Sequence, residues 1–329
     1  MRLHPVLRLL IPAVTRRLTK VSQPSATERP AKPAEAVYGP LVQKPPVDVT
    51  VTTLRIPHPD EGSDIEARVY RPGATASPDQ ARAALVYFHG GGWWQGSLET
   101  SHSHCAHLAK LADAVVISVA YRLIPEHPFP ANLRDCYTAF TWTAEHANHL
   151  GVDPSLIAVG GTSSGANLAA AVALRARDED GPAIALQLLE IPVLDITAPP
   201  QAPADAPSWY HVMVDQARQT FDRYAGSGAR PEDPLVSPLL AESLQGLPPT
   251  VILANELDVV LDHAVRYADR LREAAVPVTL TVYPGLAHGM QAFTRILPVG
   301  RRFRAEAARA LSALYERRIR RVSDREGRA

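Results

Sequence analysis

The sequence predicts an α/β fold in which a mostly parallel sheet of eight strands lies between layers of helices. Apolar, β-favouring runs alternate with helix-forming segments along most of the 329 residues. Several of these runs are apolar at almost every position, as in "AVVISVAY" at 114–121, which indicates strands buried on both faces of a sheet. The chain is long enough for one large domain of this kind.

Strands open the predicted domain, and helices enter after residue 88. The run "VTVTTLRI" at 49–56 alternates between the two faces of a strand, and apolar runs follow at 65–70 and 84–88. Further along, helical segments separate the strands, so successive strands are expected to be parallel. Later strands are expected at 114–121, 156–161, 184–195, 250–258 and 278–285. Helices are expected at 102–112, 132–146, 164–177, 213–224 and 262–275, and a long helix at the C-terminal end.

Proline-rich stretches mark the boundaries of this domain. Residues 1–20 are apolar but interrupted by Arg8 and Pro12. They therefore fit an amphipathic helix, docked on the protein or loosely on a membrane, better than a signal peptide or a spanning helix. Residues 22–48 predict an irregular linker. The expected organisation is an N-terminal segment and linker at 1–45, core at 46–195, an insertion at 196–232, core again at 233–320, and a flexible tail at 321–329.

Composition gives no indication of a charged partner. Lys and Arg together number 34, as do Asp and Glu, so nothing points to nucleic acid, and the basic end of the chain is expected to be a solvated helix end. The two cysteines, Cys105 and Cys136, form no CxxC motif, which favours a reducing cytoplasm, although a bond between them stays open.

A serine lies between glycines at the end of one predicted strand. Gly161-Thr162-Ser163-Ser164-Gly165 fits the G-x-S-x-G turn centred on Ser163, and a helix follows at once. In such a turn the glycines leave room for a strained backbone, and the helix N-terminus faces the developing oxyanion. Taken alone, the pentad also fits an ordinary glycine-serine loop.

A second glycine-rich motif stands earlier in the chain. His89-Gly90-Gly91-Gly92 follows directly on an apolar strand. Consecutive glycines let backbone N–H groups approach a substrate oxygen, which is typical of an oxyanion loop. A plain glycine-rich turn is the alternative.

A serine nucleophile needs a base, and the base needs an orienting carboxylate. Both are expected at the carboxyl ends of later strands, in the order acid then histidine. His288 follows the strand at 278–285, and Asp258 closes the strand at 250–258. Glu256 and Asp262 are competing acids, but Glu256 falls within or at the end of the strand and Asp262 is typical of a helix cap. Asp258 is favoured.

With these residues in place, the chain resembles the hormone-sensitive-lipase-like esterases, a bacterial branch of the α/β-hydrolase superfamily. The resemblance covers about residues 50–310, and the motifs agree in order and spacing. The matching segments are "HGGGWWQGS" (89–97), "VAYRLIPEHPFPA" (119–131), "VGGTSSGANLAAAVALRARD" (159–178), "PVLD" (192–195), "NELDVVLDHAVRYADRL" (255–271) and "YPGLAHGM" (283–290).

The resemblance implies an α/β-hydrolase fold and a Ser-His-Asp mechanism. Ser163 would be the nucleophile, His288 the general base and then acid, and Asp258 its orienting residue. The backbone N–H groups of Gly91, Gly92 and Ser164 would form the oxyanion hole.

It also implies a helical cap, built from residues 1–45 and 196–232, over an enclosed site for small ester substrates of short to medium acyl chain. No metal, organic cofactor or stable membrane insertion is expected. A homodimer through the last strand and C-terminal helix is a further implication. The candidate pocket residues are Trp93, Trp94, Trp209, Tyr210, Phe221 and Met290.

Three residues depart from what the family or the pattern leads one to expect. Thr162 stands where many members have Asp, as in a second, GTS-type branch, and Met290 stands where an aromatic residue is common. Glu190 is an acid within an apolar strand, where a lone carboxylate is costly unless it is bonded. The hypothesis is that Glu190 lies behind the turn and bonds near Ser163 or Thr162. The alternative is an edge residue that reaches solvent.

Other readings are weaker. The segment "SHSHCAH" could suggest a metal site at His102, His104, Cys105 and His107, but a structural helix is favoured because few of these side chains share a helix face. Rival functions on the same machinery are an amidase, an arylformamidase or a deacetylase of a metabolite. A non-catalytic ligand-binding receptor on this fold would be expected to lack the histidine, which this chain keeps.

Overall fold

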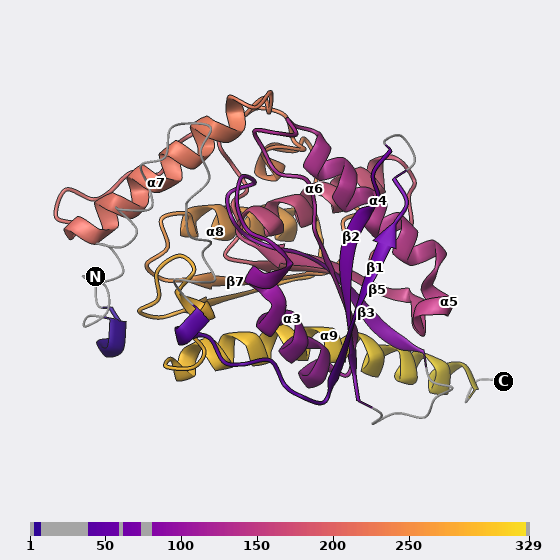
Figure 1. Cartoon of the computed structure of the whole chain (residues 1–329). Coiled ribbons are helices and arrows are strands. Elements are labelled where there is room, and N and C mark those ends of the chain that lie inside the picture. The colour runs from indigo at the N-terminus through magenta and orange to yellow at the C-terminus, as the bar shows by residue number, and fades with distance from the viewer. Residues whose placement is uncertain (1–2, 8–38, 59–61, 74–80, 327–329) are drawn as a thin grey trace.

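Eight strands form a single sheet at the centre of the protein (Figure 1). The computed structural model describes residues 3–7, 39–58, 62–73 and 81–326, with side chains as far as Tyr315. Strand order across the sheet is β1-β2-β4-β3-β5-β6-β7-β8. The pairs β1–β2 and β2–β4 are antiparallel and every later neighbouring pair is parallel, which confirms the predicted mostly parallel sheet.

The elements follow the predicted alternation. The strands are β1 Val49–Ile56, β2 Ile65–Pro72, β3 Arg82–Phe88, β4 Val115–Val119, β5 Val152–Thr162, β6 Leu186–Glu190, β7 Thr250–Asn255 and β8 Val278–Tyr283. The helices are α3 Leu98–Ala112, α4 Ala131–Glu145, α5 Ala147–Leu150, α6 Ser164–Asp178, α7 Ser208–Ala225, α8 Leu261–Glu273 and α9 Pro298–Glu326.

Two strands end earlier than predicted. β6 ends at Glu190 rather than Asp195, because Ile191 has a positive φ of 43° and Pro192 follows with no N–H for the ladder. β7 ends at Asn255 rather than Asp258. Asp258 therefore lies in the loop after the strand.

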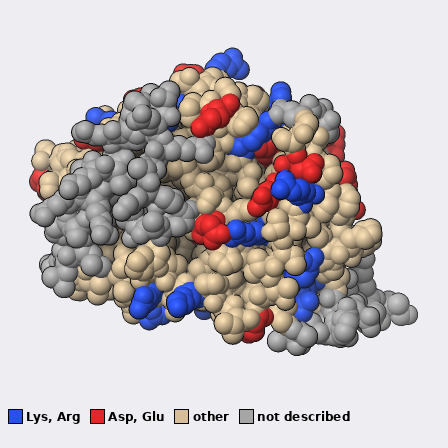
Figure 2. Space-filling model, in the orientation of Figure 1, with Lys and Arg blue, Asp and Glu red and all other residues tan. Residues whose placement is uncertain are grey.

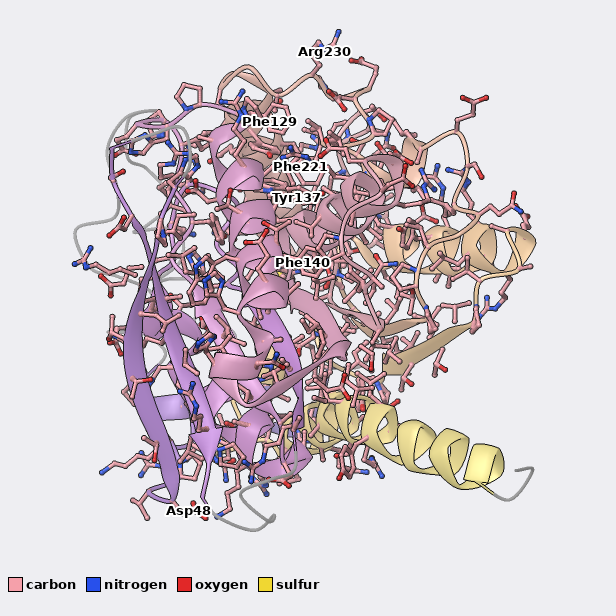
Figure 3. All side chains as sticks on the ribbon, turned by 90° about the vertical axis from the view of Figure 1, so that its right-hand side faces the viewer. Asp48, Phe129, Tyr137, Phe140, Phe221 and Arg230 are labelled. Carbon is pink, nitrogen blue, oxygen red and sulfur yellow. The ribbon has the colours of Figure 1, made fainter. Side chains whose placement is uncertain are left out.

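Helices cover both faces of the sheet (Figure 1). Side chains of α4, α6 and α8 pack into one buried apolar cluster, and those of α3 and α9 into another. Helix α7 of the insertion contributes to both clusters, Trp209 and Tyr210 to one and Phe221 and Tyr224 to the other. In Figure 3, Phe129 and Phe221 lie at the same end of the molecule as Arg230, and Asp48 lies at the opposite end.

The ends of the chain test the expected organisation only in part. Residues 8–38, which include most of the expected N-terminal helix at 1–20 and most of the expected linker at 22–48, lie outside the described residues, as does the end of the tail at 327–329. Helix α9 continues to Glu326, so residues 321–326 of the expected tail are helical. Within the described ranges, no helix is both long and apolar enough to cross a membrane.

Charge and cysteine placement agree with the composition. On the face shown in Figure 2, acidic and basic side chains are interspersed. Cys105 and Cys136 are both buried and free, so the possibility of a bond between them is closed.

Candidate active site

The serine turn joins β5 to α6. Ser163 stands between them with φ 56° and ψ −116°, a strained conformation for a residue with a side chain, which costs about 1–3 kcal/mol. A Cβ at Gly161 would lie 2.4 Å from the carbonyl oxygen of Phe88, and one at Gly165 would lie 2.0 Å from the same oxygen. Both glycines are therefore required, because β3 passes directly behind the turn.

The three residues predicted for the triad meet in space. Oγ of Ser163 lies 2.8 Å from Nε2 of His288, and Nδ1 of His288 lies 2.7 Å from Oδ2 of Asp258. A carboxylate only accepts hydrogen bonds, so Nδ1 carries the proton and Nε2 is left to accept from the serine hydroxyl. The Asp258 side chain is 2% exposed and the His288 side chain 27% exposed, so the acid is enclosed while the base is open at one side.

The loop after β7 fixes the acid. The N–H of Asp258 donates to the carbonyl of Asn255, and Oδ1 of Asp258 accepts from the N–H of Val260. The competing acids have other partners. Glu256 accepts from the N–H of Gly285, and Asp262 lies in the first turn of α8 beside Arg266. Of the three acids, Asp258 is the one paired with His288.

Asn255 holds the loop that carries the base, a role that the sequence did not reveal. Its amide donates to the carbonyl of Ala287 and to Oε1 of Gln291, both at 2.9 Å, and its side chain is buried. The strand that leads to Asp258 is thus tied to both sides of His288.

The surroundings of His288 shift its pKa. Burial of the ring lowers the pKa, but the charge of Asp258 and its hydrogen bond raise it, and the net direction is above the ordinary histidine value. A base with a raised pKa is a stronger proton acceptor for the serine hydroxyl.

The glycine-rich loop after β3 has left-handed backbone angles that favour glycine. Gly91 has φ 134° and Gly92 has φ 62°. Neither backbone N–H meets an acceptor among the residues whose positions are described. The loop is held from behind, since the Tyr121 hydroxyl donates to the His89 carbonyl at 2.7 Å and the two rings stack 4.3 Å apart.

Helix α7 packs on residues 92–94 of this loop. A Cβ at Gly92 would lie 2.6 Å from a methyl of Thr220, Trp93 stacks on Tyr224 at 4.0 Å, and the guanidinium of Arg223 lies 4.0 Å above the ring of Trp94. The indole N–H of Trp93 also donates to Asn167 on α6. The insertion, the glycine loop and the helix after Ser163 therefore form one packed unit.

The tentative pocket residues differ in exposure. Trp93 is fully buried and points into the protein, whereas Trp94 is partly exposed. Trp209, Tyr210, Phe221 and Met290 are at most 9% exposed. Burial, and then the charge of Asp258, raise the pKa of the Tyr210 hydroxyl. Their lining of a substrate pocket stays a prediction.

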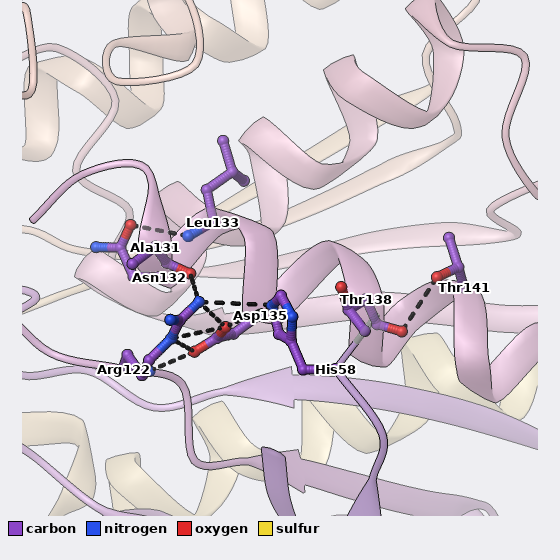
Figure 4. A network of polar contacts seen from close by, with 8 residues as sticks. All are labelled: His58, Arg122, Ala131, Asn132, Leu133, Asp135, Thr138 and Thr141. Atoms are coloured by element: carbon purple, nitrogen blue, oxygen red, sulfur yellow. Dashed lines mark hydrogen bonds and ion pairs between the residues drawn. The ribbon is translucent and has the colours of Figure 1, made fainter. Parts of the chain in front are cut away.

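The loop after β4 is braced by a buried ion pair (Figure 4). Arg122 contacts both carboxylate oxygens of Asp135 on α4, at 2.7 Å from Oδ1 and 2.9 Å from Oδ2, and the Arg122 N–H donates to the same group. His58 lies 3.4 Å from Asp135. The ion pair of Arg122 and Asp135 fixes the start of α4 next to the loop after β4. That loop contacts the glycine-rich segment, since the N–H of Ile124 donates to the Trp93 carbonyl.

The histidines of α3 have partners other than a metal. His102 bonds the Tyr70 hydroxyl, His107 bonds the carbonyl of Ser103, and His104 bonds Glu190. Within the part of the chain that the structure describes, no three His, Cys, Asp or Glu side chains cluster as metal ligands. Glu190 is 1% exposed and accepts from Thr162, so the hypothesis of a bond near the turn is confirmed and the edge alternative is wrong.

Comparison with known proteins agrees with this geometry. A family described as "alpha/beta hydrolase fold" matches residues 85–292. Carboxylic ester hydrolase LipN of Mycobacterium tuberculosis is 39% identical over 277 residues, which cover 82% of this chain and 71% of LipN. Esterase LipI of the same organism is 40% identical over 257 residues, or 76% of this chain and 78% of LipI.

Solved structures give the same result. Ester-hydrolase EH1AB1 from the metagenome of Lake Arreo superposes with a TM-score of 0.84 at 32% identity, covering 95% of this chain and 99% of that one. The esterase of Pyrobaculum calidifontis gives a TM-score of 0.77 at 31% identity, covering 96% and 99%. The chain therefore belongs to the α/β-hydrolase family, in its branch of hormone-sensitive-lipase-like esterases.

Proposed function

We propose that the protein is a serine carboxylesterase that hydrolyses short- to medium-chain acyl esters through Ser163, His288 and Asp258. The observation that carries the proposal is the continuous line of hydrogen bonds from the serine hydroxyl to the buried carboxylate. The glycine-rich loop beside it offers the backbone N–H groups of Gly91 and Gly92, two residues whose φ values suit glycine.

In the proposed reaction, Ser163 attacks the ester carbonyl while His288 takes the hydroxyl proton. The backbone N–H groups of Gly91, Gly92 and Ser164 stabilise the charge that develops on the carbonyl oxygen. His288 then protonates the leaving alcohol, and the acyl group stays on Ser163 until water, activated by the same histidine, releases the acid. The steps use no metal and no organic cofactor.

Names of relatives support the substrate class. An ethyl acetate hydrolase of Pseudomonas putida is 35% identical over 242 residues, and an arylesterase of Saccharolobus solfataricus is 33% identical over 236 residues. The first of these relatives is named for ethyl acetate, a small ester, and the second for aryl esters. The packing of α7 on the glycine loop also favours a small, covered site over an open surface for long-chain lipids.

The alternative functions are other hydrolases that use the same triad and a receptor that does not catalyse a reaction. An amidase, an arylformamidase or a metabolite deacetylase would run on the same triad. A ligand-binding receptor is disfavoured because His288 is present and contacts Ser163. A cytoplasmic location and a homodimer through β8 and α9 stay predictions, and the two free thiols support the first.

A labelling and turnover experiment tests the proposal. A fluorophosphonate should label the wild-type protein at Ser163 and leave Ser163→Ala unlabelled. A series of p-nitrophenyl esters from acetate to palmitate should give the highest kcat/KM at the short or middle chains. Formanilides and acetylated amides in the same panel separate an esterase from the amidase alternatives. A folded wild-type protein without adduct or ester turnover would refute the assignment.

A further inference from the structure

Glu190 is a buried carboxylate that the proposed reaction does not use. It is the last residue of β6 and is 1% exposed. In the sheet it pairs with Thr162, the residue directly before the nucleophile. A carboxylate at such a position is costly to bury unless its oxygens are bonded, so its contacts are informative.

Both oxygens of Glu190 have partners. Oε1 lies 2.8 Å from Nε2 of His104 on α3, and Oε2 accepts from the hydroxyl of Thr162 at 3.0 Å. Because the Thr162 proton goes to Glu190, the Tyr87 hydroxyl on β3, 2.5 Å from Thr162, is the donor of that pair. Nε2 of His104 likewise donates to the carboxylate. The result is a satisfied network that joins α3, β3, β5 and β6.

The same residue also holds the nucleophile through its main chain. The N–H of Ser163 donates to the backbone carbonyl of Glu190 at 2.9 Å. The next residue, Ile191, donates to Leu253 of β7 at 2.7 Å. Glu190 therefore holds Thr162 by its side chain and Ser163 by its backbone, and it is itself fixed to the strand that leads to Asp258.

The turn needs such support because Ser163 has a strained backbone. A left-handed φ at a residue with a side chain persists only where the surrounding contacts over-determine it. The hydrogen bonds around Glu190 provide that constraint. They act from the side of the sheet opposite α6.

The charge of Glu190 also acts on a buried cation of α9. Arg304 is 4% exposed, and burial lowers the pKa of its guanidinium to about 10, an effect that the charge of Glu190 partly offsets.

We propose that Glu190, held by His104, is a positioning residue for the nucleophile turn. It supplies from the neighbouring strand the carboxylate that position 162 lacks, and it fixes the Ser163 backbone at the angle from which Oγ reaches His288. The inference rests on the proposed esterase function, since its effect is on the reactivity of Ser163.

Three substitutions distinguish a positioning role of Glu190 from a role that only fills the core. In Glu190→Gln, the amide accepts at one atom only, so Thr162 or His104 faces a second donor. His104→Phe removes the donor but keeps a ring beside Tyr87, and His104→Gln restores an N–H at a similar reach. His104 has a 22% exposed side chain, so its variants are expected to fold even if Glu190→Gln does not.

The measurements are kcat and KM for p-nitrophenyl butyrate, the second-order rate of fluorophosphonate labelling, and Tm. Glu190→Gln should lower kcat and the labelling rate together by about tenfold, or about 1.4 kcal/mol of transition-state free energy, with KM changed less than about twofold. His104→Phe should also lower kcat and the labelling rate, but by less, with KM again little changed. His104→Gln should recover most of the lost kcat and labelling rate. Gln187→Met is the control, because Gln187 is fully buried on the same strand and bonds Thr250, away from the turn.

Each result bears on one claim. If kcat and labelling of Glu190→Gln and His104→Phe equal those of the wild type, the positioning role is overturned. A loss of Tm with kcat unchanged also overturns it, because the network would then only stabilise the core. A wild-type protein that is neither labelled nor active would instead refute the esterase function itself.

Discussion

Nδ1 of His288 lies 2.7 Å from Oδ2 of Asp258, although the two residues are 30 positions apart and follow different strands. The contact arises because parallel strands end at the same edge of the sheet, and β7 and β8 are neighbours. It fixes the ring so that Nε2 faces the hydroxyl of Ser163. The charge of the acid also holds the pKa of His288 above its ordinary value.

Asp258→Asn should therefore change the pH profile as well as the rate. An amide at this position removes the charge and can favour the wrong tautomer, so kcat should fall by about 10³ to 10⁴. Activity needs neutral His288, and in the wild type it is lost as pH falls through the raised pKa. With the charge removed, the acid limb of kcat/KM should move to lower pH.

The pH profile of kcat/KM for p-nitrophenyl acetate, followed by initial rates, checks both effects. Asp262→Asn is the matched control. Within the described residues Asp262 pairs with Arg266 on the surface of α8, so its substitution should not move the acid limb of kcat/KM. An acid limb that does not move in Asp258→Asn would contradict the assignment of the orienting acid.

The glycine loop gives a second prediction. A Cβ at Gly91 would lie 2.1 Å from the carbonyl oxygen of Gln95, and its φ of 134° disfavours any side chain. Gly91→Ala should distort the loop and misplace its N–H groups, lowering kcat by about 10² or more. Gly62→Ala has open space around the new methyl and should leave kcat unchanged. Equal kcat values for the two variants would contradict the proposed role of Gly91 in the oxyanion hole.

Much of the candidate site could be predicted because its residues stand at fixed points of an ordered topology. Ser163, Asp258 and His288 each follow a strand, and strands that alternate with helices must bring those ends together. Gly161 and Gly165 indicate that another part of the backbone lies close to the turn. In the structure, that group is the carbonyl of Phe88.

Other features could not be predicted, because they depend on contacts between distant elements. His104 is 86 positions from Glu190, and a helix pattern shows which side chains share a face but not what lies opposite that face. The packing of α7 on residues 92–94 depends on where a proline-rich insertion returns to the core. The early end of β6 depends on the backbone angle of Ile191, for which the sequence offers only the following proline.

The stack between the insertion and the glycine loop gives a third prediction. Trp93 and Tyr224 are fully buried, with ring planes 4° apart. Tyr224→Leu should lower the free energy of unfolding by about 2–4 kcal/mol and also lower kcat, because the loop residue that it supports follows Gly92. Tyr224→Phe keeps the ring and should change kcat little. Urea unfolding and kcat, measured on the same samples, test whether the stack supports both stability and turnover. The prediction is wrong if Tyr224→Leu loses stability but keeps full kcat.

The brace between Arg122 and Asp135 should affect stability more than chemistry. Asp135 is 1% exposed and accepts from the backbone and guanidinium of Arg122, so Asp135→Asn leaves a partly buried cation facing an amide (Figure 4). The free energy of unfolding should fall by about 2 kcal/mol, measured by urea denaturation. Because the pair lies behind the loop and not at the triad, KM and the fluorophosphonate labelling rate should change less than about twofold. Asp153→Asn, which changes a carboxylate that accepts from the backbone N–H and hydroxyl of Ser155 two residues away, should cost less. If Asp135→Asn instead slows labelling as strongly as Gly91→Ala, the brace would act on the oxyanion loop through the Trp93 carbonyl, which accepts from the N–H of Ile124.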